Sequence, residues 1–424
     1  MKKRYILVLF LVFFLFVSGC NNKRMKRYER KELLFWHAMG GPMGKVLDEL
    51  VQRYNATNPE YKIDATYKGG YSSLIQSLLA GIPARSLPDI SQAYESWTSK
   101  LIDNEIIVPM QPYYDKYTEE EKADFYKVLL DNNTFNGKLW SVPFNKSVPI
   151  MYYNKEMFKK YGIEPPEKWN TDPSKSEFDK ICKLLTVDAD NDGTPNQWGY
   201  AFNVSVWMWQ CFTLQAGGKI TNDTETKPLF QEDPGVEALK WWKSLMDREY
   251  AFKTQGYDFQ NNFAAGNVGM IMASSVSKFF IKPKLTFELG ITEVPGFKRK
   301  AVVLSGTNLV MLKNSPERQV AAWKFLKWLM SPEVTAEWAL RTNYLPVRKS
   351  ALETDQMKKA VEDDPTILVP LKELEYAHFA PRSSAWYNCR NILSEAIDMI
   401  MLGILKPREG LEDAAEKIES ELSK

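Results

Sequence analysis

The sequence predicts an α/β protein of two lobes, in which each lobe contains a mostly parallel sheet flanked by helices. One observation is length, because about 400 of the 424 residues remain after a leader segment and a single hydrophobic core seldom holds so many. Another is the alternation of short apolar strands with amphipathic helices from Leu33 onward, which is typical of parallel sheets. Ligands of such sheets bind beyond the carboxyl ends of the strands, so we expect the ligand site at that edge.

Residues 1–20 predict a lipoprotein signal peptide. Residues 2–4 are cationic, and an unbroken apolar run follows over residues 6–17. The run is short for a membrane-spanning helix and ends in small residues followed by Cys20. This pattern resembles the bacterial lipobox, which implies cleavage before Cys20 and lipidation of that residue. The alternative is an ordinary secretory peptide with an incidental cysteine.

Residues 21–32 are basic and polar, which favours a tether beside an anionic membrane surface, although a solvated linker would have the same composition. No basic stripe with interleaved aromatic residues occurs elsewhere, and the net charge is only +2, so we predict no nucleic-acid partner. Cys182, Cys211 and Cys389 are odd in number and widely spaced. They indicate neither a disulfide framework nor a metal site, and we expect them to be buried as small apolar residues.

The first lobe is predicted from the spacing of its apolar residues. Strands are expected from Leu33, at residues 62–67 and at residues 89–94, and two helices lie between them. Each helix has one apolar face, made by Val46, Leu47, Leu50, Val51 and Tyr54 in the first and by Leu74, Ile75, Leu78 and Leu79 in the second.

A glycine-rich turn precedes the first helix. Gly40, Gly41 and Gly44 match neither the dinucleotide fingerprint nor the P-loop, so we expect no nucleotide there. The turn is instead expected to cap the helix at the rim of the ligand site, where glycine allows positive φ and close approach. A mere tight connection is the alternative.

The rest of the chain repeats the same kinds of element. Strands and helices alternate again after residue 145, and helices dominate the last third of the sequence. We expect strands over 148–153, 263–274 and 302–312, helices over 155–161 and 236–247, two helices around Pro332, and a closing helical hairpin over 386–422.

No catalytic constellation stands out in the sequence. His37 and His378 are the two histidines, and neither G-x-S-x-G nor H-E-x-x-H occurs. We therefore predict that the protein is not an enzyme. A secreted glycoside or phosphodiester hydrolase is kept as an alternative, because the many carboxylates could include an acid and base pair.

An acidic stretch resembles the start of a calcium loop. Asp188, Asp190 and Asp192 alternate and are followed by Gly193, but Gly199 stands at the twelfth position in place of a bidentate Glu. A complete EF-hand is thus excluded. A loose calcium site and an Asx-rich turn are both left open, and no other cofactor is predicted.

Several stretches together resemble one family, the extracellular solute-binding proteins of ABC importers, and in particular its sn-glycerol-3-phosphate and maltodextrin receptors. These stretches include FWHAMGG, NPEYKIDATYKGGY, QAYESWT, PFNKSVPIMYYNKEMF, SGTNLVML and SPEVTAEWALRTNYLPVR. The resemblance extends from Leu33 to the C-terminus. It implies a two-lobed periplasmic-binding-protein-like fold of type II with the ligand in the cleft between the lobes.

The resemblance also implies a setting and a division of the chain. We expect a monomer, held at the extracytoplasmic face of the cell membrane by its lipid anchor, that delivers its ligand to a membrane permease. Lobe 1 is expected to comprise residues 33–145 and 277–315, and lobe 2 residues 146–276 and 316–424. Crossover segments are expected near 145–147, 274–277 and 313–316.

Seven ligand-binding residues follow from the match with the sn-glycerol-3-phosphate receptors. Hydroxyls, a backbone amide and a guanidinium suit a phosphate dianion. Glu95 would repel phosphate and should therefore face the glycerol hydroxyls. The seven residues are Tyr71, Glu95, Ser147, Ser274, Gly306, Tyr344 and Arg390.

Residues 385–390, AWYNCR, are instead similar to the maltodextrin receptors, in which the tryptophan stacks on a sugar ring. Two ligand classes are therefore kept: sn-glycerol-3-phosphate or a related glycerophosphodiester, and a sugar or oligosaccharide. The candidates for stacking on a sugar are Trp36, Trp169, Trp207, Trp209 and Trp386.

Overall fold

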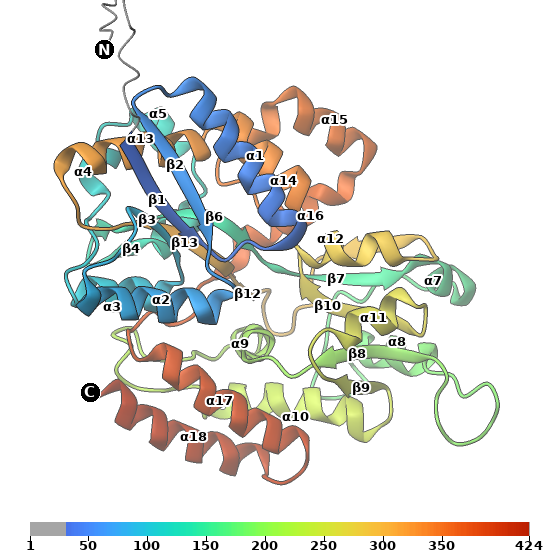
Figure 1. The fold of residues 1–424 in the computed structure, drawn as a ribbon. Coiled ribbons are helices and arrows are strands. Elements are labelled where there is room, and N and C mark those ends of the chain that lie inside the picture. The colour runs from blue at the N-terminus through green and yellow to red at the C-terminus, as the bar shows by residue number, and fades with distance from the viewer. Residues whose placement is uncertain (1–30, 424) are drawn as a thin grey trace, which may run out of the picture.

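The computed structural model describes residues 31–423. The predicted signal peptide, the lipidated Cys20 and residues 21–30 of the tether lie outside the described residues. Lys31 and Glu32, which end the predicted tether, already belong to β1 (Lys31–His37). The described chain forms two lobes, each built on a five-stranded sheet (Figure 1), which confirms the predicted α/β architecture.

The first sheet has the strand order β2-β1-β3-β13-β6. Four of its strands run in one direction and β13 opposes them. Helix α1 buries Val46, Leu47, Leu50, Val51 and Tyr54 against this sheet, which confirms the predicted face. The main elements of this lobe are β2 (Tyr61–Tyr67), β3 (Ile90–Ala93), β6 (Ser141–Ser147), β13 (Ser305–Met311), α1 (Gly41–Thr57), α2 (Tyr71–Ala84), α3 (Glu95–Asp103), α13 (Pro316–Leu329) and α14 (Pro332–Thr342).

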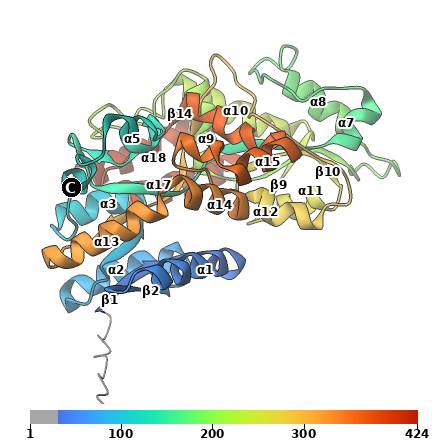
Figure 2. The same ribbon diagram turned by 90° about the horizontal axis from the view of Figure 1, so that it is seen from above.

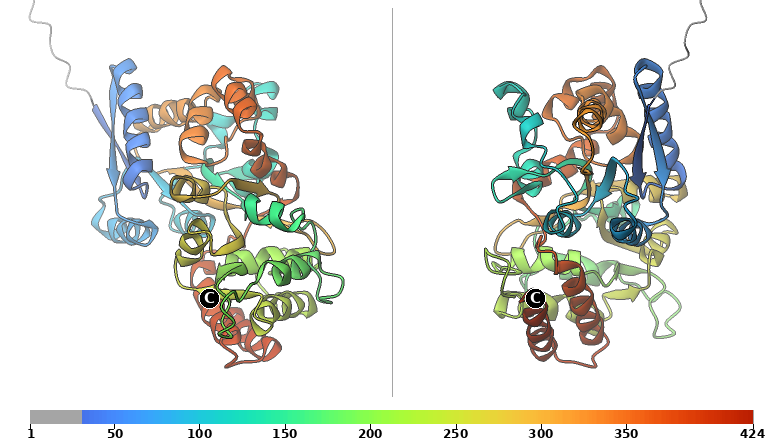
Figure 3. Two further views of the ribbon diagram at one scale, coloured as in Figure 1. Left: turned by 90° about the vertical axis from the view of Figure 1, so that its right-hand side faces the viewer. Right: turned by 60° about the vertical axis from the view of Figure 1, so that its left-hand side comes forward.

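The second sheet repeats this pattern with the order β11-β7-β10-β8-β9, in which β7 is the opposing strand. The C-terminal hairpin of α17 and α18 packs beneath α9 and α10 (Figure 3). The elements of this lobe are β7 (Pro149–Asn154), β8 (Trp198–Asn203), β9 (Ala251–Thr254), β10 (Val268–Ser274), β11 (Leu289–Thr292), α7 (Lys155–Tyr161), α8 (Glu177–Leu185), α9 (Val206–Gln215), α10 (Asp233–Asp247), α11 (Asp258–Ala264), α12 (Ser277–Ile281), α17 (Trp386–Met401) and α18 (Pro407–Leu422).

Shorter elements complete the lobes and the segments that join them. Seen from above, α1, β1 and β2 lie on one side of the molecule, and α7 and α8 lie at its far end (Figure 2). No helix among the described residues has both the length and the apolar character that a membrane span requires. The short elements are α4 (Gln111–Tyr114), α5 (Glu119–Ala123), α6 (Lys127–Asn132), α15 (Asp355–Asp363), α16 (Val369–Lys372), β4 (Thr134–Phe135), β5 (Lys138–Leu139), β12 (Val302–Val303), β14 (Ala377–His378), and the 3₁₀ turns η1 (Lys282–Lys284), η2 (Lys349–Glu353), η3 (Pro365–Leu368) and η4 (Glu373–Tyr376).

The strand pairing locates the places where the chain passes between the sheets. One crossover is Val148, between β6 and β7, beside the predicted position at 145–147. The others lie at 293–304, between β11 and β13, and in the segment that precedes α17, where β14 pairs with β12. The crossovers expected at 274–277 and 313–316 are absent from those places in the described chain, because β10, α12 and β11 stay together and α13 stays beside β13.

The position of α13 bears on the division into lobes. Phe325 of this helix contacts Phe35 of β1 and Tyr54 of α1, with ring centroids 5.9 and 4.9 Å apart. We therefore propose residues 31–147 and 305–363 for the first lobe and 149–292 and 386–422 for the second. The division implied by the resemblance assigns α13 to the second lobe, and local periodicity could not correct it, because the packing of a helix on a distant strand leaves no mark there.

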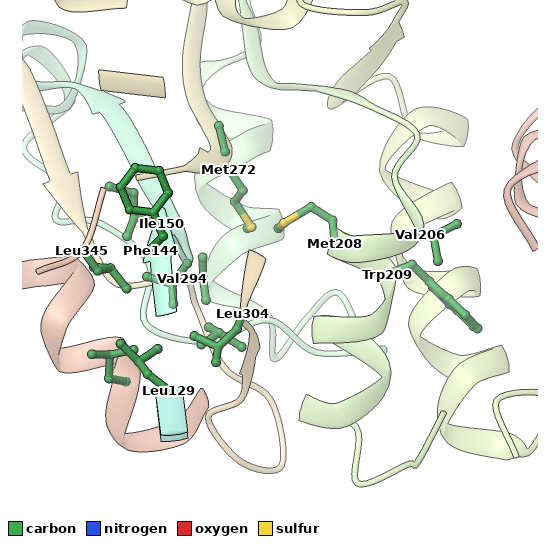
Figure 4. Packing of buried hydrophobic residues seen from close by; sticks show 14 of the residues in the cluster. Leu129, Phe144, Ile150, Val206, Met208, Trp209, Met272, Val294, Leu304 and Leu345 are labelled. Carbon is green, nitrogen blue, oxygen red and sulfur yellow. The ribbon is translucent and has the colours of Figure 1, made fainter. Parts of the chain in front are cut away.

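The hydrophobic core is continuous across both lobes. Figure 4 shows Phe144 of β6 and Ile150 of β7 on either side of the first crossover, with Met272 of β10 directed toward Met208 of α9. Cys182, Cys211 and Cys389 are free and buried, as predicted.

The glycine turn before α1 has the geometry expected of it, but a different contact. Gly41 has φ +57°, and a Cβ on Gly40 would lie 2.7 Å from the hydroxyl of Tyr67 on the neighbouring strand. The close approach is therefore made within the first lobe.

Candidate functional site

A cavity of about 240 Å³ lies between the two lobes. The first lobe contributes the starts of α2 and α3 and the start of β13, and the second lobe contributes α9 and the first turns of α17. The lining includes the charged and aromatic residues Tyr71, Tyr94, Glu95, Trp97, Trp207, Trp386, Tyr387 and Arg390.

The first-lobe residues occupy the carboxyl edge of the sheet, as predicted. Strand β3 ends at Ala93, and α3 begins two residues later at Glu95. A carboxylate in the first turn is favourable there, because the unpaired amides of a helix start carry partial positive charge. Helix α2 begins at Tyr71 after Gly69, whose φ of +82° suits glycine.

The Glu95 carboxylate is fixed by two donors from behind. Lys146 Nζ donates to its Oε1 at 2.8 Å and Asn308 Nδ2 donates to the same oxygen at 3.2 Å. The Lys146 side chain is fully buried, while that of Glu95 is 15% exposed. The carboxylate therefore keeps one oxygen directed to internal donors and presents the other side to the cavity.

Two tyrosines and an asparagine form a hydrogen-bonded group next to Glu95. Asn145 Nδ2 donates to the Tyr71 hydroxyl at 3.0 Å. Burial raises the pKa of Tyr71 well above its ordinary value, and a hydrogen bond with Tyr344 adds to this shift. Burial raises the pKa of Tyr344 as well. Both phenols are therefore neutral, and Tyr71 is the one that lines the cavity.

Arg390 reaches the cavity from the second lobe. The residue is exposed on α17, and no ion pair or side-chain hydrogen bond joins its guanidinium to another described residue. Burial raises the pKa of Tyr94, and the Arg390 charge opposes that shift, so the two groups are electrostatically coupled across the cavity. A guanidinium with no internal partner has its five donors available for a ligand.

Three of the seven predicted residues lie on the strands of the crossover region and do not line the cavity. Ser147 ends β6 opposite Ser305, and Ser274 ends β10 opposite Pro149. Gly306 has φ +88°, and a Cβ there would lie 1.8 Å from the Asn145 carbonyl oxygen, so the position requires glycine. The structure thus brings Tyr71, Glu95 and Arg390 together at the cavity, with Tyr344 behind Tyr71.

The predicted stacking residues separate into two groups. Trp386 and Trp207 line the cavity, and the indole of Trp207 donates to the Val303 carbonyl at 2.7 Å. Trp36 lies outside it, with Lys68 Nζ 4.2 Å above its ring.

Trp169 and Trp209 must be removed from the stacking residues. They are 1% and 0% exposed in the core of the second lobe, where Trp169 stacks on Trp241 at 4.2 Å. Apolar burial accounts for both, since neither ring face can reach a ligand.

The acidic loop closes on its own hydrogen bonds. Oxygens of Asp188, Asp190 and Asp192 lie within 4.8 Å of one another. The amide of Gly193 donates to Asp188 at 3.0 Å and that of Thr194 donates to Asp192 at 2.8 Å. Gly199 lies in β8, so the loop has no twelfth-position ligand. Calcium binding stays a prediction.

A larger cavity of about 880 Å³ lies between α12 and the α14–α15 region. Most of its lining is apolar, and Tyr344 is the one predicted ligand residue that lines it. The Lys278–Asp364 ion pair, 2.8 Å long, is part of its wall. The smaller cavity, which both the unpaired guanidinium and the carboxylate line, is therefore the candidate ligand site.

Sequence reasoning missed Lys146, Tyr94, Trp97 and Tyr387. The signal for Lys146 was a lysine within a strand whose seven residues are all buried. A charged residue is almost never fully buried unless it is paired, so this lysine implied a partner. The three aromatic residues carried no signal that separates a cavity lining from ordinary core.

The comparisons with known proteins agree with this geometry. The family described as bacterial extracellular solute-binding protein matches residues 49–366. The chain belongs to this family. As a member it is the solute-binding protein of an ABC transporter, a non-enzymatic receptor that acts outside the cytoplasm. The predicted family and the prediction that the protein is not an enzyme are therefore confirmed.

Relatives of this solute-binding protein with known ligands fall into both predicted classes. The sn-glycerol-3-phosphate-binding periplasmic protein UgpB of Escherichia coli K12 is 26% identical over 401 residues, which is 90% of each chain. UgpB of Mycobacterium tuberculosis in complex with glycerophosphocholine has a TM-score of 0.79 at 22% identity, over 92% of this chain and 98% of that one. The cyclic α-maltosyl-1,6-maltose binding protein of Arthrobacter globiformis has a TM-score of 0.78 at 23% identity, over 93% and 99%. These structures confirm the periplasmic-binding-protein fold.

Proposed function

We propose that this solute-binding protein captures sn-glycerol-3-phosphate or a related glycerophosphodiester and delivers it to a membrane permease, while a lipid on Cys20 holds it at the extracytoplasmic face. One observation carries the choice of ligand. The cavity joins the unpaired Arg390 guanidinium of one lobe to the Glu95 and Tyr71 side chains of the other. The phosphate end of a glycerol phosphate needs a cationic donor, and the glycerol end needs hydrogen-bonding partners for its hydroxyls.

The binding mode follows from the donors and acceptors. The phosphate is bound by Arg390, which offers planar paired N–H groups. The glycerol hydroxyls face the Glu95 carboxylate, which accepts hydrogen bonds. Because the two groups belong to different lobes, a bound ligand links the lobes and stabilises the closed form, as in other hinge-closing receptors. The closed form is the one presented to the permease.

A sugar or oligosaccharide is the second candidate. Trp207, Trp386 and Tyr387 line the same cavity, and aromatic rings suit the apolar faces of sugars. The relatives named above include a receptor whose name gives an oligosaccharide ligand. The same rings are also compatible with an organic headgroup on a glycerophosphodiester.

Thermal unfolding of the purified protein tests the proposal. sn-Glycerol-3-phosphate, glycerophosphocholine and maltotriose are added separately, each at increasing concentration. A ligand present at about 100 times its dissociation constant stabilises the native state by about 2.7 kcal/mol, which moves the midpoint visibly. A shift with the phosphorylated compounds supports the proposal. A shift with maltotriose alone replaces it with the sugar candidate.

A further inference from the structure

A lysine lies fully buried beneath the candidate cavity. Lys146 Nζ is 2.8 Å from Glu95 Oε1, 2.9 Å from Asn132 Oδ1 and 3.2 Å from the Gly306 carbonyl oxygen. An ammonium group has three N–H donors, so these acceptors use all of them. The lysine therefore joins the first turn of α3, the last turn of α6 and the second residue of β13.

The contact with Glu95 is also a charge pair. A buried ammonium is strongly unfavourable unless a carboxylate compensates it, and Glu95 is the one carboxylate that pairs with Lys146 among the described residues. No described residue donates a hydrogen bond to Glu95 Oε2. The pair therefore cancels the charge from behind and leaves one oxygen of the carboxylate free to accept from a ligand.

Other charges near Glu95 do not replace this lysine. Arg382, in the segment before α17, interacts electrostatically with Glu95, but its guanidinium forms its ion pair with Glu225, at 3.9 Å. Its Nη1 donates to the carbonyl oxygens of Asp131 and Thr134. Arg390 has no such internal partner and lies on the opposite lobe. Lys146 is thus the cation that directly neutralises the carboxylate at the cavity floor.

We infer that Lys146 is a positioning residue that sets the ligand charge this cavity accepts, because it neutralises Glu95 and lets a carboxylate and a phosphate occupy one small site. The inference rests on the proposed function, since it explains how a cavity that contains the largely buried Glu95 carboxylate can bind an anion. Without Lys146, Glu95 would meet the phosphate as an uncompensated negative charge in a site of low dielectric.

The test compares four proteins that differ in charge at this pair: the unaltered chain, Lys146→Met, Glu95→Gln, and the double variant. Calorimetric titration with sn-glycerol-3-phosphate gives each affinity, and circular dichroism checks the fold. We expect Lys146→Met to bind at least tenfold more weakly than the unaltered chain. The neutral double variant should bind at least threefold more tightly than Lys146→Met, and Glu95→Gln, which keeps Lys146 but loses a charged acceptor for the glycerol hydroxyls, should bind more tightly than the double variant. Lys175→Met, an exposed lysine with the same change in charge, should bind normally.

Each outcome decides a different point. If Lys146 had only a structural role, the double variant would bind no more tightly than Lys146→Met. That result would overturn the inference. If Lys146→Met does not fold, Glu95→Gln must bind more tightly than the double variant, and equal affinities would reject the role. If the unaltered chain does not bind the phosphate, the proposed function itself fails and the inference falls with it.

Discussion

At the scale of single residues, the decisive group is Arg390. It carries a full charge at the cavity and its guanidinium has no partner among the described residues, whereas most other described arginines lie in ion pairs or donate to carbonyl groups. Such a group is poised to contribute to binding only when a ligand supplies the counter-charge. Its neighbour Trp386, one turn earlier on α17, is 4% exposed and is packed before any ligand arrives.

Replacing Arg390 with Ala should weaken the binding of a phosphorylated ligand by about 2 to 5 kcal/mol, because a desolvated charge pair is lost. Calorimetric titration measures this change. Arg408→Ala is a matched control, since Arg408 lies on α18 in a half-exposed surface ion pair. An affinity that is unchanged in Arg390→Ala would refute the phosphate-directed role.

Replacing Trp386 with Ala separates the two ligand classes. If the ring stacks on a sugar, maltotriose binding should disappear while sn-glycerol-3-phosphate still binds. Loss of this buried ring should also lower the free energy of unfolding by about 3–5 kcal/mol, so titrations are made well below the new midpoint. A variant that loses the phosphate response instead would reverse the assignment.

At the scale of elements, the sequence was most informative where structure is local. The apolar faces of α1 and α2 follow from spacing alone; the α1 face is buried as predicted, and on α2 Leu74, Ile75 and Leu78 are buried while Leu79 is half-buried. Strand β13, in contrast, lies between β3 and β6, which are more than 150 residues away in sequence. No local pattern specifies such a pairing, and this is why the crossovers after Val148 and the position of α13 could not be read from the sequence.

The site residues also divide into those that the sequence could identify and those that it could not. Tyr71, Glu95 and Arg390 could be proposed because each stands in a motif that resembles the family, and the cavity brings them together. Trp169 and Trp209 could not be told from surface tryptophans, because burial depends on the packing of the whole lobe. The partner of Lys146 was equally hidden, since 51 residues separate it from Glu95.

Gly306 gives a prediction about β13. Gly306→Ala places a Cβ at positive φ and against the Asn145 backbone oxygen, so we expect a loss of unfolding free energy well above the about 1–2 kcal/mol of left-handed strain alone. Gly137→Ala is the control, because Gly137 has φ +74° and nothing within 4 Å of the added Cβ. Chemical denaturation measures both. Equal losses would show that the contact with β6 is unimportant.

At the scale of the whole molecule, stability should depend on pH through a buried carboxyl. Burial raises the pKa of Glu373 from 4.5 to about 8, although the Val294 amide donates to it at 2.7 Å. Burial lowers the pKa of His37 from 6.5 to about 4, so that residue changes stability between those two values, in the opposite sense. Burial lowers the pKa of His378 as well, so the two histidines oppose Glu373 mainly below pH 7, and the effect of Glu373 is measured between pH 7 and 8.

The direction in which stability changes with pH follows from proton binding. In this range the folded protein keeps a proton on Glu373 that the unfolded chain releases, so the free energy of unfolding should fall as pH rises to about 8, by at most about 1.4 kcal/mol per pH unit. Glu373→Gln should flatten this slope, as measured by urea denaturation at several pH values. A slope that persists unchanged in the variant would assign it to other groups.

The junction of β6 and β7 has a consequence for the order of events in binding. Only Val148 separates the two strands, and each is paired within its own sheet. Because this connection is a single residue, the lobes can separate at this point only by rotation. The residues next to this pivot, Lys146 and Ser147, then keep their places while the outer walls of the cleft swing. An incoming solute would therefore contact the base of the cleft in its final arrangement, and binding would begin there before the second lobe closes.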